Sequence, residues 1–141
     1  MGMLIDGTWA QGTAGSAEAD GHFKREAATF RRWVTADGQP GPDGAPGVPA
    51  APDRFRLYVS LACPWAHRTL IMRALKGLET MIPVSVVHWY MGEQGWSFTP
   101  GEGVVADPEH GARHLHELYA AARPGMTGKV TVPVLWDRHD G

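Results

Sequence analysis

The chain has little cysteine and no long hydrophobic run. Cys63 is the single cysteine among 141 residues, so no disulfide can form within the chain, and the cysteine count fits a reducing compartment. We therefore expect a cytoplasmic protein. No stretch of about 20 apolar residues could cross a bilayer, and the N-terminus lacks a basic segment followed by a hydrophobic core. The sequence thus predicts neither a signal peptide nor a membrane anchor.

Net charge is also nearly absent. Thirteen Lys and Arg residues against 15 Asp and Glu residues give a formal charge of −2, which offers no electrostatic attraction to nucleic acid or to an anionic membrane. The length corresponds to about one domain, and the apolar fraction of 43% is typical of globular proteins. We expect a soluble globular domain that binds neither nucleic acid nor membrane.

The first third of the chain is poor in regular patterns. Residues 1–20 are small, polar and glycine-rich, which predicts a flexible arm. Apolar residues between 23 and 34 recur at helical spacing and predict a short amphipathic helix. Residues 38–49 form four Gly-X-Y triplets, too few for a collagen helix, so we expect a solvated polyproline-type loop. The predicted division is thus an N-terminal region, 1–53, and a folded domain, 54–141.

A strand, a helix and a second strand are predicted after residue 53. Alternating apolar residues predict a strand over 54–60, and a helix with an apolar stripe should begin at Pro64 and stop near Gly77. Residues 82–89 are apolar on both faces and β-branched, as in a central parallel strand. Together these elements predict a right-handed β-α-β unit.

A loop, a helix and a strand complete the pattern. The loop over 91–106 contains Trp96, and Asp107 is the expected N-cap of a helix that runs to residue 122. Residues 130–136 predict a strand with Pro133 inside it, which is tolerated only at an edge, a bulge or a bond of special geometry. The order of elements predicts an α/β, thioredoxin-like fold.

Cys63 is the strongest candidate for chemistry. It follows the first of these strands and stands at the first turn of the helix, where the helix dipole and unpaired N–H groups favour the nucleophilic thiolate. Thioredoxin-like oxidoreductases commonly use Cys-x-x-Cys, but Ala66 occupies the second position here. A single thiol requires an external resolving thiol, and glutathione is the obvious one in the cytosol.

The segment 54–78, with Ser-Leu-Ala-Cys-Pro-Trp-Ala-His-Arg at 60–68, resembles the glutathionyl-hydroquinone reductases, the xi class of glutathione transferases. Further matching segments cover most of 22–137 in family order, at 30–38, 85–88, 91–98 and 128–137. The resemblance implies a glutathione transferase N-terminal domain that is truncated before its last strand and helix. It also implies that the helical C-terminal domain, and with it most of the family's homodimer interface, is absent.

The resemblance implies a reaction as well. Cys63 would attack the sulfur of a glutathionyl-hydroquinone, release the hydroquinone and form a mixed disulfide that a second glutathione resolves, with no metal involved. Pro64 and Trp65 would belong to the helix N-terminus around the thiolate. The implied glutathione-binding residues are Trp96, Lys129, Val132 and Pro133, with a cis bond before Pro133 and Lys129 where the family commonly has an Arg.

Other interpretations remain open for these residues. Cys63 alone could be an inert buried cysteine, Trp96 a packed aromatic lid, and His67 and Arg68 either polarising groups or solvent-facing side chains. The chain could also be an omega-like thiol transferase or dehydroascorbate reductase, or an inactive truncated product that only binds glutathione or other chains. Four further histidines, in and before the second predicted helix, are expected to be solvated and to bind no metal: His88, His110, His114 and His116.

Overall fold

The computed structural model describes residues 2–12 and 28–141, which belong to two compact units. The main unit takes residues up to 14 together with 53–141, and the small unit takes 15–52. The expectation of a flexible arm is wrong for residues 2–12, because they contain two paired strands of the main unit. Residues 13–20 of that expected arm lie outside the described residues. The predicted division between 53 and 54 stays a prediction.

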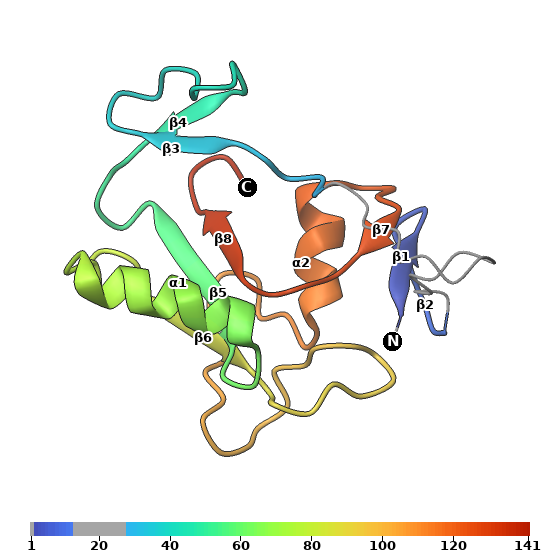
Figure 1. Ribbon diagram of the computed structural model, residues 1–141. Coiled ribbons are helices and arrows are strands. Elements are labelled where there is room, and N and C mark those ends of the chain that lie inside the picture. Colours follow the sequence, from blue (N-terminus) through green and yellow to red (C-terminus); the bar gives the residue numbers. More distant parts are fainter. Residues whose placement is uncertain (1, 13–27) are drawn as a thin grey trace, which may run out of the picture. The chain divides into compact units, whose positions relative to one another are not determined.

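Three strands form the central sheet of the main unit (Figure 1). β5 (Phe55–Ser60) lies in the middle, with β6 (Val84–Val87) parallel on one side and β8 (Val134–Asp137) antiparallel on the other. The strand at the start of the domain and the parallel pairing are confirmed. β6 was expected to be a central strand but is an edge strand of this sheet. A run of apolar residues indicates that both faces of a strand are buried, and it does not indicate how many strands pair with it.

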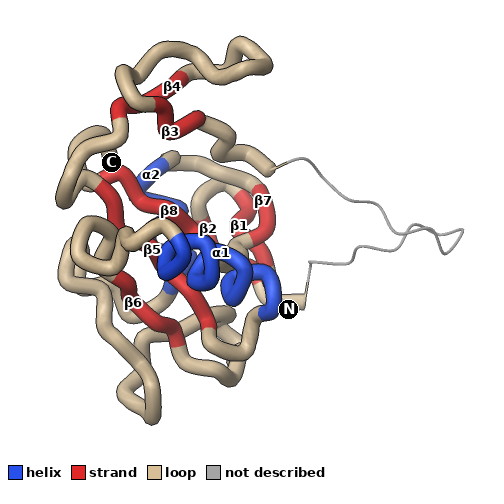
Figure 2. Tube along the Cα trace, turned by 60° about the vertical axis from the view of Figure 1, so that its left-hand side comes forward, coloured by secondary structure: helices blue, strands red, loops and turns tan. Residues whose placement is uncertain are grey.

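Two helices lie on opposite faces of this sheet (Figure 2). α1 (Pro64–Leu75) begins at the predicted residue and buries Ala66 completely. Its predicted apolar stripe is only partly packed, because Ile71 and Leu75 are 44% and 75% exposed. The spacing of apolar residues correctly predicted a helix with an apolar face. The residues of α1 that pack into the core beside β5 include Ala66 and Leu70.

α2 (Leu115–Ala122) begins seven residues later than predicted. Asp107 does cap backbone N–H groups, but they belong to a turn: its carboxylate accepts hydrogen bonds from Glu109, His110 and Ala112 at 3.0 to 3.1 Å. Gly111, with a φ of 62°, then leaves helical geometry. This turn therefore separates the cap from the helix.

The Asp107 carboxylate also joins the turn to the centre of the sheet. Its side chain is fully buried and accepts a hydrogen bond of 2.6 Å from the Tyr58 hydroxyl on β5. Burial and this carboxylate raise the pKa of Tyr58, which keeps its hydroxyl a donor. Burial alone would raise the pKa of Asp107, but the Tyr58 and backbone hydrogen bonds hold it below its usual range.

Two further carboxylates pair with arginines beside the sheet. Glu109 lies 2.8 Å from Arg56 and 3.0 Å from Arg138, and Asp137 lies 2.6 Å from Arg54. Burial opposes ionisation of both carboxyl groups, but the arginines lower the pKa of each. Ionised carboxylates are thus built into the native structure at three positions.

These carboxylates predict a loss of stability in acid. A folded-state pKa below the unfolded value of about 4 gives stabilisation that is complete above that pH and is lost as the pH falls through the folded pKa. The free energy of unfolding from urea titrations should therefore stay level down to about pH 5 and decline below about pH 4. A free energy that stays level or rises through this acid range would contradict the prediction.

Two further sheets are formed, one in each unit. β1 (Met3–Ile5) pairs antiparallel with β2 (Thr8–Ala10) and with β7 (Gly128–Lys129), and Leu4 on β1 is completely buried. In the small unit, β3 (Trp33–Thr35) pairs parallel with β4 (Gly47–Pro49), and β4 lies within the segment 38–49 that was expected to be loop.

The short helix predicted over 23–34 is wrong where it can be checked, at 28–34, which holds part of β3 and no helix. Residues 23–27 lie outside the described residues. Trp33 pairs with Gly47 in the parallel strands, and its indole N–H also donates to Asp43 at 2.7 Å in the loop between them. Among the residues that the structure describes, no helix is long and apolar enough to cross a membrane.

Candidate thiol site

The end of β5 positions Cys63. The buried Ser60 accepts hydrogen bonds from two N–H groups of the following turn: its carbonyl from Cys63 at 3.1 Å and its hydroxyl from Ala62 at 3.3 Å. Cys63 is then the N-cap residue of α1, with extended backbone and no side-chain cap, and Pro64 occupies the first turn. The thiol is partly buried at the N-terminus of a helix, as predicted from the sequence.

The thiol lies beside a second segment that is distant in sequence. Cys63 Sγ donates to the Val132 carbonyl oxygen at 3.7 Å, across 69 residues of chain. The Val132–Pro133 bond is cis, so this prediction is confirmed. Of the strand predicted over 130–136, only the part after the cis bond is strand, in β8, and the residues 130–133 between β7 and β8 are not. The structure therefore brings Cys63, Val132 and Pro133 together.

Tyr119 on α2 holds the chain next to the cis bond. Its hydroxyl donates to the Thr131 carbonyl at 2.8 Å and accepts from the Thr131 N–H at 3.4 Å. Burial raises the pKa of Tyr119, so the phenol keeps its proton. This role of Tyr119 was not predicted from the sequence. The available signal was that a buried tyrosine usually has a hydrogen-bond partner.

The other predicted residues are held by separate contacts. Trp96 is partly buried against the core, and its carbonyl accepts a hydrogen bond of 2.9 Å from Leu115 at the start of α2. Lys129 pairs with Met3 in the sheet of β1 and β7, three residues before Val132. Trp65 is 59% exposed on the first turn of α1, where the Arg68 guanidinium lies 6.0 Å from its ring centre. Arg68 is therefore engaged with an indole ring beside the thiol.

An open depression of about 360 Å³ lies along the loop that carries Trp96. It is lined by residues from 88 to 99 together with His114, and Cys63 is not one of its lining residues. The depression and the thiol thus lie at different places on the main unit.

Comparison with known proteins identifies the fold. Residues 62–141 match the family model described as glutathione S-transferase, N-terminal domain. The chain belongs to this glutathione S-transferase family. The thioredoxin-like architecture predicted from the sequence is thereby confirmed.

The similarity extends to individual glutathione S-transferases. The chain is 53% identical over 139 residues to the glutathionyl-hydroquinone reductase YqjG of Escherichia coli K12, and this match covers 98% of the chain and 42% of the relative. A xi-class enzyme from Natrialba magadii has 49% identity and a TM-score of 0.82, covering 99% of this chain and 41% of the other. The predicted resemblance to the xi class is confirmed.

Two further matches bear on ligand and class. The glutathione-bound structure of YqjG has 48% identity and a TM-score of 0.77, covering 97% of this chain and 39% of the other. A Schizosaccharomyces pombe relative named glutathione S-transferase omega-like 2 is 47% identical over 118 residues, covering 84% of this chain and 36% of the relative. The chain thus spans about two fifths of the length of the first relatives that it matches.

Proposed function

We propose that this chain carries the thiol and glutathione-binding part of a glutathionyl-hydroquinone reductase, with Cys63 as its nucleophile. One observation carries the proposal: the only thiol of the chain stands at the N-terminus of α1, 3.7 Å from the carbonyl that precedes the cis-Pro133 bond. The similarity to YqjG supports the choice of reaction. A glutathione-rich, reducing compartment such as the cytoplasm suits a monothiol cycle.

The proposed cycle has two sulfur exchanges. The Cys63 thiolate attacks the glutathione sulfur of the conjugate, so that a sulfur–sulfur bond forms and the bond between sulfur and the aromatic ring breaks. The ring carbon keeps the electron pair and takes a proton, which releases the hydroquinone. A second glutathione thiolate then attacks the mixed disulfide, forms oxidised glutathione and returns Cys63 as a thiolate. The ring carbon is reduced and two glutathione sulfurs are oxidised, so the electrons balance without a metal.

The neighbouring groups have proposed roles in holding glutathione. The backbone of Val132 before Pro133 would pair with the glutathione backbone in the manner of an added antiparallel strand. Trp96 would pack on the tripeptide, and Lys129 would attract a carboxylate as a point charge without the bidentate grip of an arginine. The N-terminal turn of α1 at Pro64 and Trp65 would stabilise the charged sulfur. The quinone pocket and a dimer interface would be formed by residues in the part of the relatives' sequence that this chain does not match.

A turnover assay tests the proposal. The purified chain is mixed with glutathione and the glutathionyl conjugate of p-benzohydroquinone, and hydroquinone and oxidised glutathione are measured by chromatography. We expect the two products in equal amounts, and intact-mass analysis should find one glutathionyl group on the chain when free glutathione is limiting. A chain with a folded circular-dichroism spectrum that yields neither product nor adduct would contradict the proposal.

An omega-like thiol transferase is the second candidate, because the Schizosaccharomyces pombe relative carries that name and a monothiol suits both reactions. Dehydroascorbate and a glutathionylated peptide, offered beside the hydroquinone conjugate, distinguish the two. Faster turnover of dehydroascorbate or the peptide would favour the omega-like enzyme. Formation of the Cys63 adduct without any turnover would instead favour an inactive chain that only binds glutathione.

A further inference from the structure

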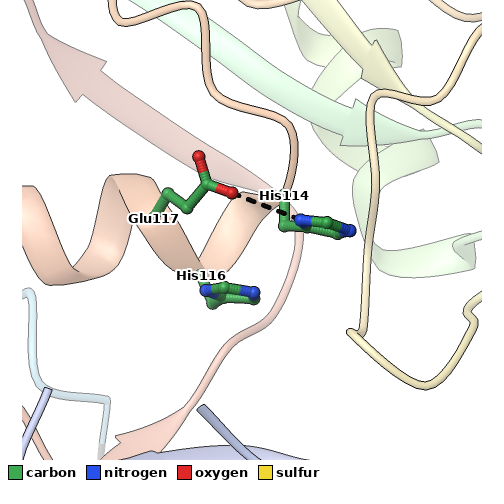
Figure 3. A group of neighbouring side chains, drawn as sticks. All are labelled: His114, His116 and Glu117. Atoms are coloured by element: carbon green, nitrogen blue, oxygen red, sulfur yellow. Dashed lines mark hydrogen bonds and ion pairs between the residues drawn. The ribbon is translucent and has the colours of Figure 1, made fainter. Parts of the chain in front are cut away.

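Three metal-binding side chains gather where α2 begins, away from the Cys63 thiol. His114 Nδ1 lies 3.2 Å from Glu117 Oε1, and donor atoms of His114, His116 and Glu117 all lie within 4.8 Å of one another. Figure 3 shows the Glu117 carboxylate turned toward the His114 ring and the two imidazoles side by side. From the sequence, His114 and His116 were expected to be solvated and to bind no metal, and Glu117 was not recognised as a third donor beside them.

The local backbone explains the cluster. His114 is the N-cap residue of α2 and has extended geometry, with φ of −134° and ψ of 148°, and it bridges to Ser97 in the preceding loop. His116 is the second residue of α2, and at this junction its ring stacks on that of His114 with 5.3 Å between ring centres. Leu115 between them is completely buried and anchors the junction. Glu117 then follows in the first helical turn.

His116 is held in a fixed place within this group. Its ring stacks between Trp9, at 4.9 Å between ring centres, and His114, at 5.3 Å. Its Nε2 atom is buried and has no hydrogen-bond partner among the described residues. Buried polar atoms without a partner are rare and costly in native proteins. This nitrogen therefore departs from the expectation of a solvated histidine.

We propose that His114, His116 and Glu117 form a binding site for a divalent transition metal, with Zn²⁺ as the best-matched ion. Two imidazoles and one carboxylate are a donor set that zinc accepts, with water in the fourth position. Tetrahedral bonds of about 2.0–2.1 Å place ligand atoms roughly 3.3 Å apart. The 3.2 Å spacing of His114 and Glu117 already matches this value.

Metal binding would also require the imidazole rings of His114 and His116 to change their orientation. They are nearly parallel, with an angle of 5° between their planes, and a metal must lie near the plane of each imidazole that binds it. Binding therefore requires a ring to turn out of the stack and the donor atoms to close from as much as 4.8 Å. His114 also lines the open depression beside the loop, which gives an ion a path from solvent. The site is independent of the proposed thiol chemistry.

The test uses the Cys63→Ser chain, so that no thiolate can supply a ligand. Titration calorimetry with Zn²⁺ should find a single site per chain, and Co²⁺ should give visible absorption bands without a sulfur charge-transfer band. His114→Ala, Glu117→Gln and His116→Phe should each weaken binding by at least about tenfold, since even changes to groups that only support metal ligands cost about 10- to 100-fold.

Two features of the design keep the result interpretable. His116→Phe keeps an aromatic ring against Trp9 and removes only the donor nitrogens, so a loss of binding cannot be assigned to a lost stack. His139→Ala is the matched control, because that histidine is 76% exposed near the end of the chain. Binding that is absent, or that is equal in the control and the three ligand variants, would overturn the proposal and leave an adventitious ion only.

Discussion

Replacing Cys63 with serine should abolish hydroquinone release from a glutathionyl-hydroquinone, with a loss of at least about 10³-fold, as when an enzyme loses its nucleophile. Serine keeps the size and the helix position but replaces the thiol with a hydroxyl that stays protonated near neutral pH. It also cannot form the sulfur–sulfur bond of the mixed disulfide. Rates from the turnover assay, together with intact-mass analysis for a glutathionyl adduct, measure the effect.

The control for this substitution is Met72→Ser on the same helix. Met72 is 51% exposed on α1 and lies well beyond the first turn, so its replacement changes a sulfur-containing side chain without touching the site. Circular dichroism should show all three chains folded. Activity that survives in Cys63→Ser would place the nucleophile elsewhere, and equal losses in both variants would assign the effect to the helix and not to the thiol.

Replacing Asp107 with alanine should lower the free energy of unfolding by about 3–5 kcal/mol, the range for breaking a buried polar network. The change leaves the Tyr58 hydroxyl and three backbone N–H groups without their acceptor, and the bonds from Tyr58 and Ala112 are buried. Domains of this size are stabilised by only about 5–15 kcal/mol, so the variant should unfold at much lower urea concentration. Tryptophan fluorescence during urea titration measures the difference.

Two companion variants separate the parts of this network. Tyr58→Phe removes one hydrogen bond and should cost about 1–2 kcal/mol. Glu102→Ala removes an exposed carboxylate from a neighbouring loop and should stay within about 0.5 kcal/mol of the parent. A loss below about 1 kcal/mol for Asp107→Ala would mean that water replaces the carboxylate and that the network is not essential to the fold.

The thiol site was predictable because its signals are local. A proline in the first helical turn and a cysteine directly before it define the start of α1 whatever surrounds them. The cis bond before Pro133 followed from the family resemblance, and the structure has it. The contact between Cys63 and Val132 depends on how segments 69 residues apart pack together, so no local sequence pattern predicts it.

The errors have equally specific causes. Asp107 was correctly expected to cap N–H groups, but its partner Tyr58 lies 49 residues away, and Gly111 ends the turn before a helix can form. The N-terminal hairpin was missed although Asp6-Gly7 is a strong hairpin signal. Both residues have positive φ, 48° and 77°, as a two-residue turn requires. The small, polar and glycine-rich composition of residues 1–20 led instead to the prediction of a flexible arm.

That hairpin also constrains how the protein is made. The N-terminal β1 pairs with β7, and Asp6 donates its backbone N–H to Thr127, 121 positions further along the chain. During synthesis β1 can pair with β2 early, but its second neighbour, β7, is available only after residue 129 has emerged from the ribosome. Contacts between such remote segments slow folding because a long loop must close first. One edge of β1 thus stays without its partner strand until β7 has been made.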